Sequence, residues 1–226
     1  MKKQSTCLFA SFLSSLIFIG CVSTTQMYDE FQSSARTTYD SPEGAFKSLR
    51  PTLKYVLRSR TPIELAKTDP VLMLDKNTDN RGYFKIVEFE IKEQGNYDIK
   101  GIINCRCFGK LSGKNAVMAR LFLLNRKTGK ILMSFPGITK EHISFVDGDQ
   151  WANRLQASLT PGLYSLIVAA DNAVKGASIF NFEAYGAMPV PVTIDIYSSP
   201  DGKVDLQIQP KPMNSTSAVP SSGRAD

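Results

Sequence analysis

The chain has a single histidine, His142, and a single tryptophan among its 226 residues. Any Ser-His-Asp or Cys-His mechanism would have to use that histidine. His142 lies beside charged residues in TKEHISF, with no nucleophile motif nearby, and the G-x-S-x-G pattern of serine hydrolases is missing from the sequence. The sequence therefore favours a protein that is not an enzyme, in which His142 is an ordinary surface or strand-edge residue.

A long hydrophobic run is also lacking. The apolar stretch CLFASFLSSLIFIG, Cys7 to Gly20, contains three serines and is shorter than the about 20 apolar residues of a membrane-spanning helix. Two lysines precede it, and no basic residue follows until Arg36, whereas a stop-transfer segment is normally followed by basic residues. A basic start, a short apolar run and a small residue are typical of a secretory signal. We therefore expect a signal peptide over residues 1–20.

The end of this run, Phe18-Ile19-Gly20-Cys21, resembles the bacterial lipobox. The resemblance implies that the signal is cut before Cys21, which is diacylated on its sulfur and acylated on its new amine. Val22, rather than Asp, follows the cysteine, and by resemblance to enterobacterial sorting this implies an outer-membrane lipoprotein facing the periplasm. Its acyl chains would anchor it stably, at about 0.8 kcal/mol per buried methylene. The alternative is a cleaved signal with a chance cysteine.

Strong charge of one sign is absent. Without Lys2 and Lys3, 25 basic residues face 21 acidic ones, a net charge of +4. This mild excess permits contact with lipid headgroups or acidic polymers without requiring it. No basic block is interleaved with aromatic residues, so nucleic acid is not an expected partner.

Cysteine is scarce, since only Cys105 and Cys107 remain beside Cys7 and Cys21. The pair has three interpretations: two small residues on the core face of a strand, a disulfide favoured by an oxidising periplasm, or a metal or redox site with His142. Same-face neighbours on a strand lie about 6.5–7 Å apart, so a disulfide would be strained. Zinc sites usually show two spaced pairs. The first two interpretations are favoured, and no metal or cofactor is expected.

Alternating apolar and polar residues dominate the chain from about Leu53. KIVEFEIK places Val87, Phe89 and Ile91 on one face, a period of two that is typical of half-buried strands. VMARLFLLN is continuously apolar and predicts an interior strand, and RKTG predicts a hairpin turn into KILMSF. Further strands are expected in YDIKGIINCRC, RLQASL, LYSLIVAA, ASIFNFE, PVTIDIYS and KVDLQIQ. This series predicts a mainly β protein, an antiparallel, jelly-roll-like β-sandwich.

One short N-terminal helix is expected in SPEGAFKSL. Ser41 can cap it, Pro42 suits its first position, and Pro51 limits its length. The predicted organisation is a signal at 1–20, a flexible tether at 21–40, a β-sandwich with its leading helix at 41–209, and a disordered tail at 210–226.

The stretch FVDGDQW holds the candidate ligand patch. Asp147 and Asp149 share one predicted turn, which is a poor arrangement for a glycosidase pair and offers few oxygens for calcium. Trp151 beside Asp149 and Gln150 has the composition of a sugar-stacking platform. These three residues are therefore the predicted ligand patch.

Two family resemblances rest on LQASLTPGLYSLIVAADN. Leu-Thr-Pro-Gly-x-Tyr between apolar strands is similar to secreted jelly-roll modules of the pre-peptidase C-terminal type. Over about residues 43–175, the order of features resembles the maltose operon periplasmic protein (MalM) family: EGAFKSL, VEFEI and YDIKGII, ARLFLLNRKTGK, then ANRLQASLTPGLYSLIVAADN. The second resemblance implies a periplasmic protein linked with maltodextrin uptake and without known catalysis.

Two other functions stay open. One is a structural subunit of an envelope assembly or secretion complex, in which an exposed strand edge takes a partner strand. The other, less favoured, is an enzyme that depends on the two thiols or on a metal.

Overall fold

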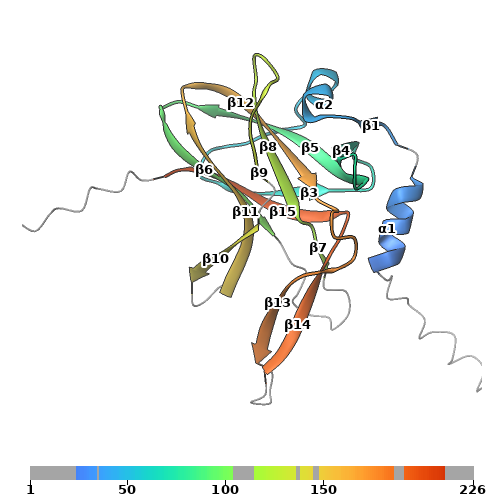
Figure 1. The fold of residues 1–226 in the computed structure, drawn as a ribbon. Coiled ribbons are helices and arrows are strands. Elements are labelled where there is room, and N and C mark those ends of the chain that lie inside the picture. The colour runs from blue at the N-terminus through green and yellow to red at the C-terminus, as the bar shows by residue number, and fades with distance from the viewer. Residues whose placement is uncertain are drawn as a thin grey trace, which may run out of the picture.

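The computed structural model describes residues 24–34, 36–103, 115–135, 138–144, 148–185 and 191–211. These residues form two short helices and a series of strands (Figure 1). The elements are α1 (Thr24–Ser33), β1 (Thr38–Tyr39), α2 (Pro42–Ser48), β2 (Leu53–Lys54), β3 (Arg60–Leu65), β4 (Val71–Asp75), β5 (Asn80–Ile91), β6 (Gly95–Ile103), β7 (Asn115–Ala116), β8 (Ala119–Asn125), β9 (Ile131–Phe135), β10 (Ile138–Ser144), β11 (Gly148–Leu159), β12 (Gly162–Ala170), β13 (Ser178–Tyr185), β14 (Pro191–Ser198) and β15 (Gly202–Pro210).

The strands pair into three sheets. The first follows the order β1-β4-β5-β12-β8-β9 with β2 beside β5, the second β10-β11-β6-β15-β3, and the third β13-β14-β7. Pairing is antiparallel except where the two-residue strands β1, β2 and β7 join β4, β5 and β14. The protein is mainly β, with a β-sandwich-like domain, so the predicted fold class is confirmed.

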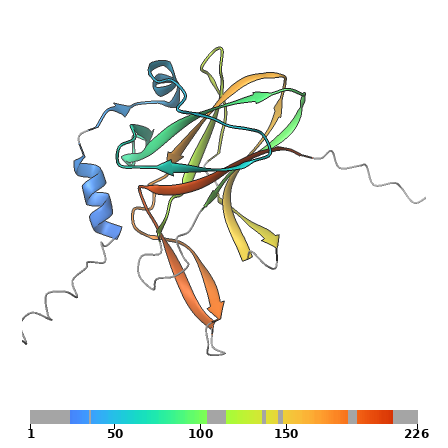
Figure 2. The same ribbon diagram turned by 180° about the vertical axis from the view of Figure 1, so that it is seen from behind.

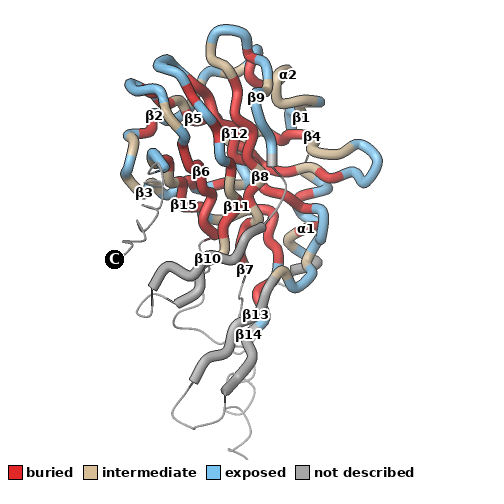
Figure 3. The backbone as a smooth tube through the Cα atoms, turned by 60° about the vertical axis from the view of Figure 1, so that its left-hand side comes forward, coloured by how far each residue is buried: buried red, intermediate tan, exposed pale blue. Residues whose placement is uncertain are grey.

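The core has two layers because three strands of the first sheet are buried on both faces (Figure 3). Alternate residues of β5, β8 and β12, among them Phe89, Leu123 and Leu166, pack with Ile99 and Leu206 of the second sheet. The intervening residues pack on the other side against α2. Burial on both faces explains why VMARLFLLN is continuously apolar, and β8 is the interior strand that this pattern predicts.

Helix α2 forms where the sequence places it. The Ser41 side chain accepts a hydrogen bond from the Gly44 amide at 3.1 Å, and Pro42 begins the helix. Phe46 is buried against the first sheet, and the Arg126 guanidinium lies 5.2 Å above its ring. The N-cap and the buried face together stabilise this short helix.

Helix α1 corrects the expectation of a flexible tether at 21–40. Thr24–Ser33 is helical, and Tyr28 and Phe31 are only 4% and 6% exposed. The Phe31 ring meets Tyr83 of β5 edge-on, with 4.7 Å between the centroids. Two buried aromatic side chains three residues apart hold this polar helix on the sandwich. The protein therefore has two helices where one was expected.

Several short turns connect different sheets. The hairpin predicted at RKTG is confirmed, because β8 pairs with β9 and the Asn125 side chain accepts the amides of Lys127 and Thr128. The turn at Thr160–Pro161 instead joins β11 of the second sheet to β12 of the first. The connections from β5 to β6 and from β14 to β15 also lead from one sheet to another. Adjacent strands in sequence are thus often opposite one another in the sandwich.

The third sheet extends away from the other two. Figures 1 and 2 show the β13–β14 hairpin projecting beyond the sandwich, at the end of the molecule where α1 begins. The tail predicted at 210–226 lies outside the described residues from 212 onward, and β15 ends at Pro210.

Candidate functional site

Three of the predicted residues lie outside the described residues: Cys21, Cys105 and Cys107. Strand β6, which was expected to run through the two internal cysteines, is described as far as Ile103. The interpretations of the cysteine pair and the lipidation of Cys21 therefore stay predictions. In the backbone register of the β10–β11 ladder, His142 pairs with Asp149.

Asp149, Gln150 and Trp151 belong to strand β11 and not to a turn. They pair with His142, Glu141 and Lys140 of β10. The side chains of Asp149 and Gln150 lie outside the described residues, so the predicted ligand patch stays a prediction.

Trp151 lies on the core side of its strand. It is half-buried, and its face of β11 continues through Asn153 and Leu155, which are buried. A sugar-stacking platform needs an open aromatic face, and this position offers only part of one.

The outer face of the second sheet carries paired charged side chains, of which Asp98 and Lys100 are nearly buried and Arg60 is exposed. Arg154 donates two hydrogen bonds to the Asp98 carboxylate, both 2.6 Å long. Lys100 lies 3.5 Å from the same carboxylate. Arg60 forms an ion pair with Asp205 at 2.8 Å. Arg154, Lys100 and Arg60 occupy one cross-strand row of the ladder with Gln207 between the last two. Such paired charges satisfy one another and stabilise the polar surface of the sheet.

A cavity of about 520 Å³, which we call the distal pocket, lies at one end of the sandwich. It is lined by residues from the segment before β3, the β5–β6 connection and the end of β15: Tyr55, Val56, Leu57, Arg58, Glu90, Lys92, Glu93, Tyr97 and Pro210. Val56 in this lining is 73% exposed. The pocket thus offers apolar surface together with charges of both signs.

The floor of the distal pocket is held by hydrogen bonds of two tyrosines. The Tyr55 hydroxyl accepts the Ile208 amide at 2.8 Å and donates to the Ser59 carbonyl, and the Tyr97 hydroxyl donates to the Glu93 carbonyl at 2.8 Å. Burial raises the pKa of Tyr55, so its hydroxyl stays protonated. Since both hydroxyls are engaged, the groups open to a ligand are Arg58, Lys92 and the two glutamates.

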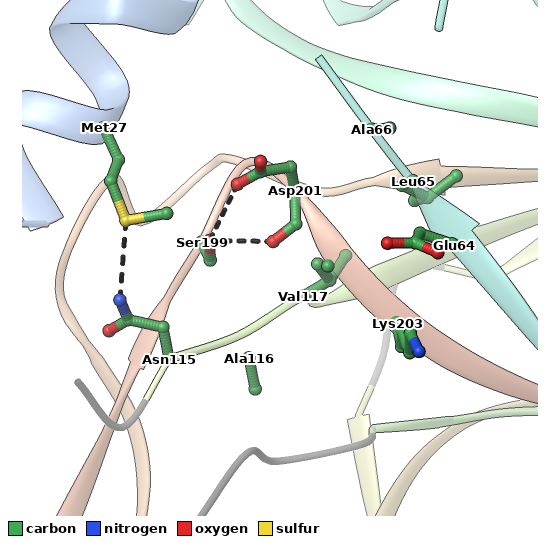
Figure 4. A pocket seen from close by; sticks show the side chains of 11 residues that line it. Met27, Glu64, Leu65, Ala66, Asn115, Ala116, Val117, Ser199, Asp201 and Lys203 are labelled. Carbon is green, nitrogen blue, oxygen red and sulfur yellow. Dashed lines mark hydrogen bonds between the residues drawn. The ribbon is translucent and has the colours of Figure 1, made fainter. Parts of the chain in front are cut away.

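A smaller cavity of about 220 Å³ lies at the opposite end of β15, beneath α1 (Figure 4). Met27, Asn115 and Ser199 line it, with Glu64, Asp201 and Lys203 from the paired strands β3 and β15 and the turn before β15. The Asn115 amide donates to the Met27 sulfur at 3.5 Å, and the Ser199 hydroxyl donates to the Asp201 carbonyl at 2.8 Å. This proximal pocket is therefore a gap at the seam between α1 and the sandwich.

A buried polar cluster fixes α1 and the base of the third sheet. The Tyr28 hydroxyl lies 3.2 Å from Asn172 Oδ1 and 3.0 Å from Ser198 Oγ. The Ser198 hydroxyl donates to the Val174 carbonyl at 2.6 Å, and the Asn172 amide group donates to the Arg81 carbonyl at 2.7 Å. Burial is the main cause that raises the pKa of Tyr28, so the hydroxyl remains a donor.

The same cluster contains a buried ion pair. Asp171 accepts from Arg120 Nε at 3.0 Å, from Asn80 Nδ2 at 2.8 Å and from the Ala173 amide at 3.2 Å. Asp171 and Asn172, which follow β12, thus join β5, β8 and α1. Their role in this structure is to hold elements together, because each oxygen of Asp171 already has a donor.

Within the described ranges, no group of three or more His, Cys, Asp or Glu side chains is placed to bind a metal ion. None of the helices in the described part of the chain is long and apolar enough to cross a bilayer.

No protein-family model matches the chain, and no curated protein matches it. Among solved structures, the chain is similar to the pre-peptidase C-terminal domain of collagenase from Bacillus anthracis, at 13% identity and a TM-score of 0.33 over 71% of this chain and 97% of that domain. The resemblance to the maltose operon periplasmic protein family stays a prediction.

Sequence reasoning missed both the distal pocket and the docking of α1. Tyr28 and Phe31, three positions apart in TTQMYDEFQS, were a signal for an apolar helix face. The distal pocket had no local signal, because its lining comes from segments as far apart as Tyr55 and Pro210.

Proposed function

We propose that the protein is an outer-membrane lipoprotein, anchored through Cys21 and facing the periplasm, whose β-sandwich binds a ligand without catalysing a reaction. Its ligand is a maltodextrin or related carbohydrate, and its role is accessory to uptake. The lipobox-like sequence and the family resemblance motivate the anchor and the ligand. The observation that carries the proposal is the position of the distal pocket relative to α1.

The distal pocket and α1 lie at opposite ends of β15. β15 begins beside the proximal pocket under α1 and ends at Pro210 in the distal pocket. Its nine residues span about 26 Å at 3.3 Å per step. Because α1 begins three residues after Cys21 and is fixed to the sandwich, an anchored protein would present the distal pocket away from the bilayer.

The lining of the distal pocket suits a polyhydroxylated ligand. Arg58 and Lys92 can donate hydrogen bonds to sugar hydroxyls, and Glu90 and Glu93 can accept them. Val56 and Leu57 supply apolar surface for the carbon faces of a sugar ring. A volume of about 520 Å³ accommodates part of an oligosaccharide chain.

The anchor is tested by the mass of the mature N-terminus. An acylated Cys21 supports the proposal; a free Cys21, or cleavage elsewhere, would remove the membrane part of it. The ligand is tested by isothermal titration of the purified protein with maltoheptaose. Saturable binding is expected, and Val56→Asp should weaken it at least about tenfold, which corresponds to 1.4 kcal/mol. Leu132→Asp, at an exposed position of β9, is the matched control and should bind as the wild type does.

A second function is favoured by the edge of the first sheet. Within the described residues β9 pairs only with β8, so its other edge carries no strand, and Leu132 on it is 48% exposed. An exposed apolar edge strand is a site for strand addition by a partner. Under this alternative the protein is a subunit of an envelope assembly.

Crosslinking and pull-down from the native envelope separate the two functions. A stable protein partner that is lost in Leu132→Asp and kept in Val56→Asp would support the assembly subunit. Sugar binding that shows the reverse dependence would support the carbohydrate accessory.

A further inference from the structure

Arg58 has a backbone conformation that arginine rarely adopts. Its φ angle is 70°, in the left-handed region that disfavours residues with a Cβ. It occupies the third position of the turn Val56–Ser59, which a hydrogen bond of 3.3 Å from the Ser59 amide to the Val56 carbonyl closes. Turns with a positive φ at this position favour glycine or asparagine. The chain thus carries an arginine where a glycine would be more stable.

The surrounding contacts hold the turn in this conformation. The Arg58 amide donates to the Ile208 carbonyl at 2.9 Å. The buried Tyr55 hydroxyl bonds both the Ser59 carbonyl and the Ile208 amide, and the Ser59 hydroxyl donates to the Val56 carbonyl at 2.7 Å. Backbone strain persists where neighbours fix the local structure in this way, and it is concentrated at ligand-binding sites.

The Arg58 side chain is exposed and lines the distal pocket. Among the described residues its guanidinium has no hydrogen-bond or ion-pair partner, although Glu90 and Glu93 line the same cavity. Arg60, two positions later, is instead paired with Asp205 at 2.8 Å. The guanidinium of Arg58 is therefore available to a ligand in the pocket.

The type of side chain indicates which ligand group it suits. A sugar hydroxyl needs a single donor or acceptor, which asparagine supplies, and asparagine also tolerates a positive φ. A guanidinium adds a permanent positive charge and a planar fork of donors that matches a carboxylate, sulfate or phosphate. An arginine at the strained position of this turn therefore indicates an anionic group on the ligand.

The remaining lining suits the uncharged part of a sugar. Val56 and Leu57 offer apolar surface, and Glu90 and Glu93 can accept hydrogen bonds from hydroxyl groups. The two carboxylates also repel an anion, so the anionic group of a ligand has its favourable position beside the basic side chains.

We infer that Arg58 is the specificity-determining residue of the distal pocket, and that the preferred ligand is an acidic sugar whose anionic group the guanidinium binds. This inference rests on the proposed function, because it uses the same pocket and narrows the same class of ligand. A neutral maltodextrin occupies the pocket without an ionic contact to Arg58 and binds more weakly.

The test compares two sugars that differ in one charge. Maltobionate and maltitol have the same glucosyl unit on an open-chain end, which carries a carboxylate in the first and a hydroxymethyl group in the second. In isothermal titration of the purified full-length protein, maltobionate should bind at least about tenfold more tightly than maltitol at low salt. Added salt should reduce this difference. Gluconate, the acid without the glucosyl unit, should bind at least about tenfold more weakly than maltobionate.

Arg58→Gly tests the residue itself. It should bring the affinities for maltobionate and maltitol to within about twofold of each other, because the guanidinium is lost. Its urea midpoint should rise, since glycine adopts a positive φ without strain. Arg50→Gln is the control, because it removes an exposed basic residue outside the pocket, and it should keep the preference for maltobionate.

The outcomes separate this inference from the proposed function. Equal binding of maltobionate and maltitol to the wild type overturns the inference and leaves the carbohydrate proposal intact. A preference that survives in Arg58→Gly, or a urea midpoint that falls in this variant, overturns the role of Arg58. Gluconate that binds as tightly as maltobionate reduces the site to an anion site and overturns the acidic sugar. A wild type that binds neither these sugars nor maltoheptaose overturns both proposals.

Discussion

Tyr28 in α1 donates a hydrogen bond toward the side-chain oxygen of Asn172, 144 residues later in the chain, with 3.2 Å between the two oxygens. Asn172 in turn donates to the Arg81 carbonyl of β5, and its own amide bonds Asn80 at 3.0 Å. A helix of polar composition is thereby joined to the loop after β12 and to the first sheet.

Phe31→Ala should destabilise the protein by about 3 kcal/mol, because it removes a nearly fully buried aromatic ring that packs on Tyr83. Urea unfolding followed by circular dichroism measures this. Gln32→Ala, at the neighbouring exposed position, is the control and should stay within about 0.5 kcal/mol of wild type. Identical midpoints for the two variants would mean that α1 does not dock in solution.

Alkaline pH should weaken the fold through Tyr28. Burial raises its pKa above the ordinary value of 10.0, so above about pH 10 the unfolded chain loses this proton first and the free energy of unfolding falls with rising pH. Below pH 10 both states keep the proton and the contribution is fully present. Burial raises the pKa of Tyr55 as well.

Tyr28→Phe should therefore show a shallower loss of stability between about pH 10 and 11 than wild type. At neutral pH it should cost about 1 kcal/mol, because the hydrogen bonds to Asn172 and Ser198 are lost. Denaturant titrations at several pH values give both quantities. Parallel pH curves for the two proteins would contradict the burial of this hydroxyl.

Asp171→Ala should cost about 3 kcal/mol, because it leaves Arg120 and Asn80 without the carboxylate that binds both. The Asp171 side chain is only 5% exposed, so water cannot replace it freely. Glu30→Ala removes the exposed ion pair with Lys67 and should cost no more than about 1 kcal/mol. Thermal unfolding of the two variants side by side is the measurement, and equal losses would refute the buried cluster.

Gly82→Ala should prevent normal folding or cost more than about 3 kcal/mol. A Cβ at Gly82 would stand 1.8 Å from the Ala170 carbonyl oxygen, so backbone of β12 would have to move. Gly95→Ala is the matched control, since its nearest neighbour would be a Tyr97 ring carbon at 3.7 Å. Soluble yield and the unfolding midpoint report the difference; a tolerated Gly82→Ala would show that the two strands are further apart.

The candidate site was only partly accessible from sequence. Trp151 was chosen as a lone aromatic beside polar residues, and the structure places it half-buried in β11, on the face that continues through the buried Asn153 and Leu155. The distal pocket was not predicted, because Val56 and Arg58 form a pocket only together with Glu93 and Pro210, which are distant in the sequence. A pocket assembled from distant segments leaves no pattern within any one of them.

The sequence by itself determined several of the longer strands, the faces of β5 and the capped helix α2, whereas β3, β4, β10 and the start of β11 were not predicted. Alternation at Val87, Phe89 and Ile91 and the Ser41–Pro42 start are local properties, governed by backbone geometry and by the period of burial. Only the tertiary structure decided which strand pairs with which. β5 and β6 follow each other but lie in different sheets, since a short connection can bend between sheets as readily as it closes a hairpin. The docking of α1 was likewise decided by Tyr83 and Asn172, because a polar helix of ten residues is stable only where distant residues bury its two aromatic side chains.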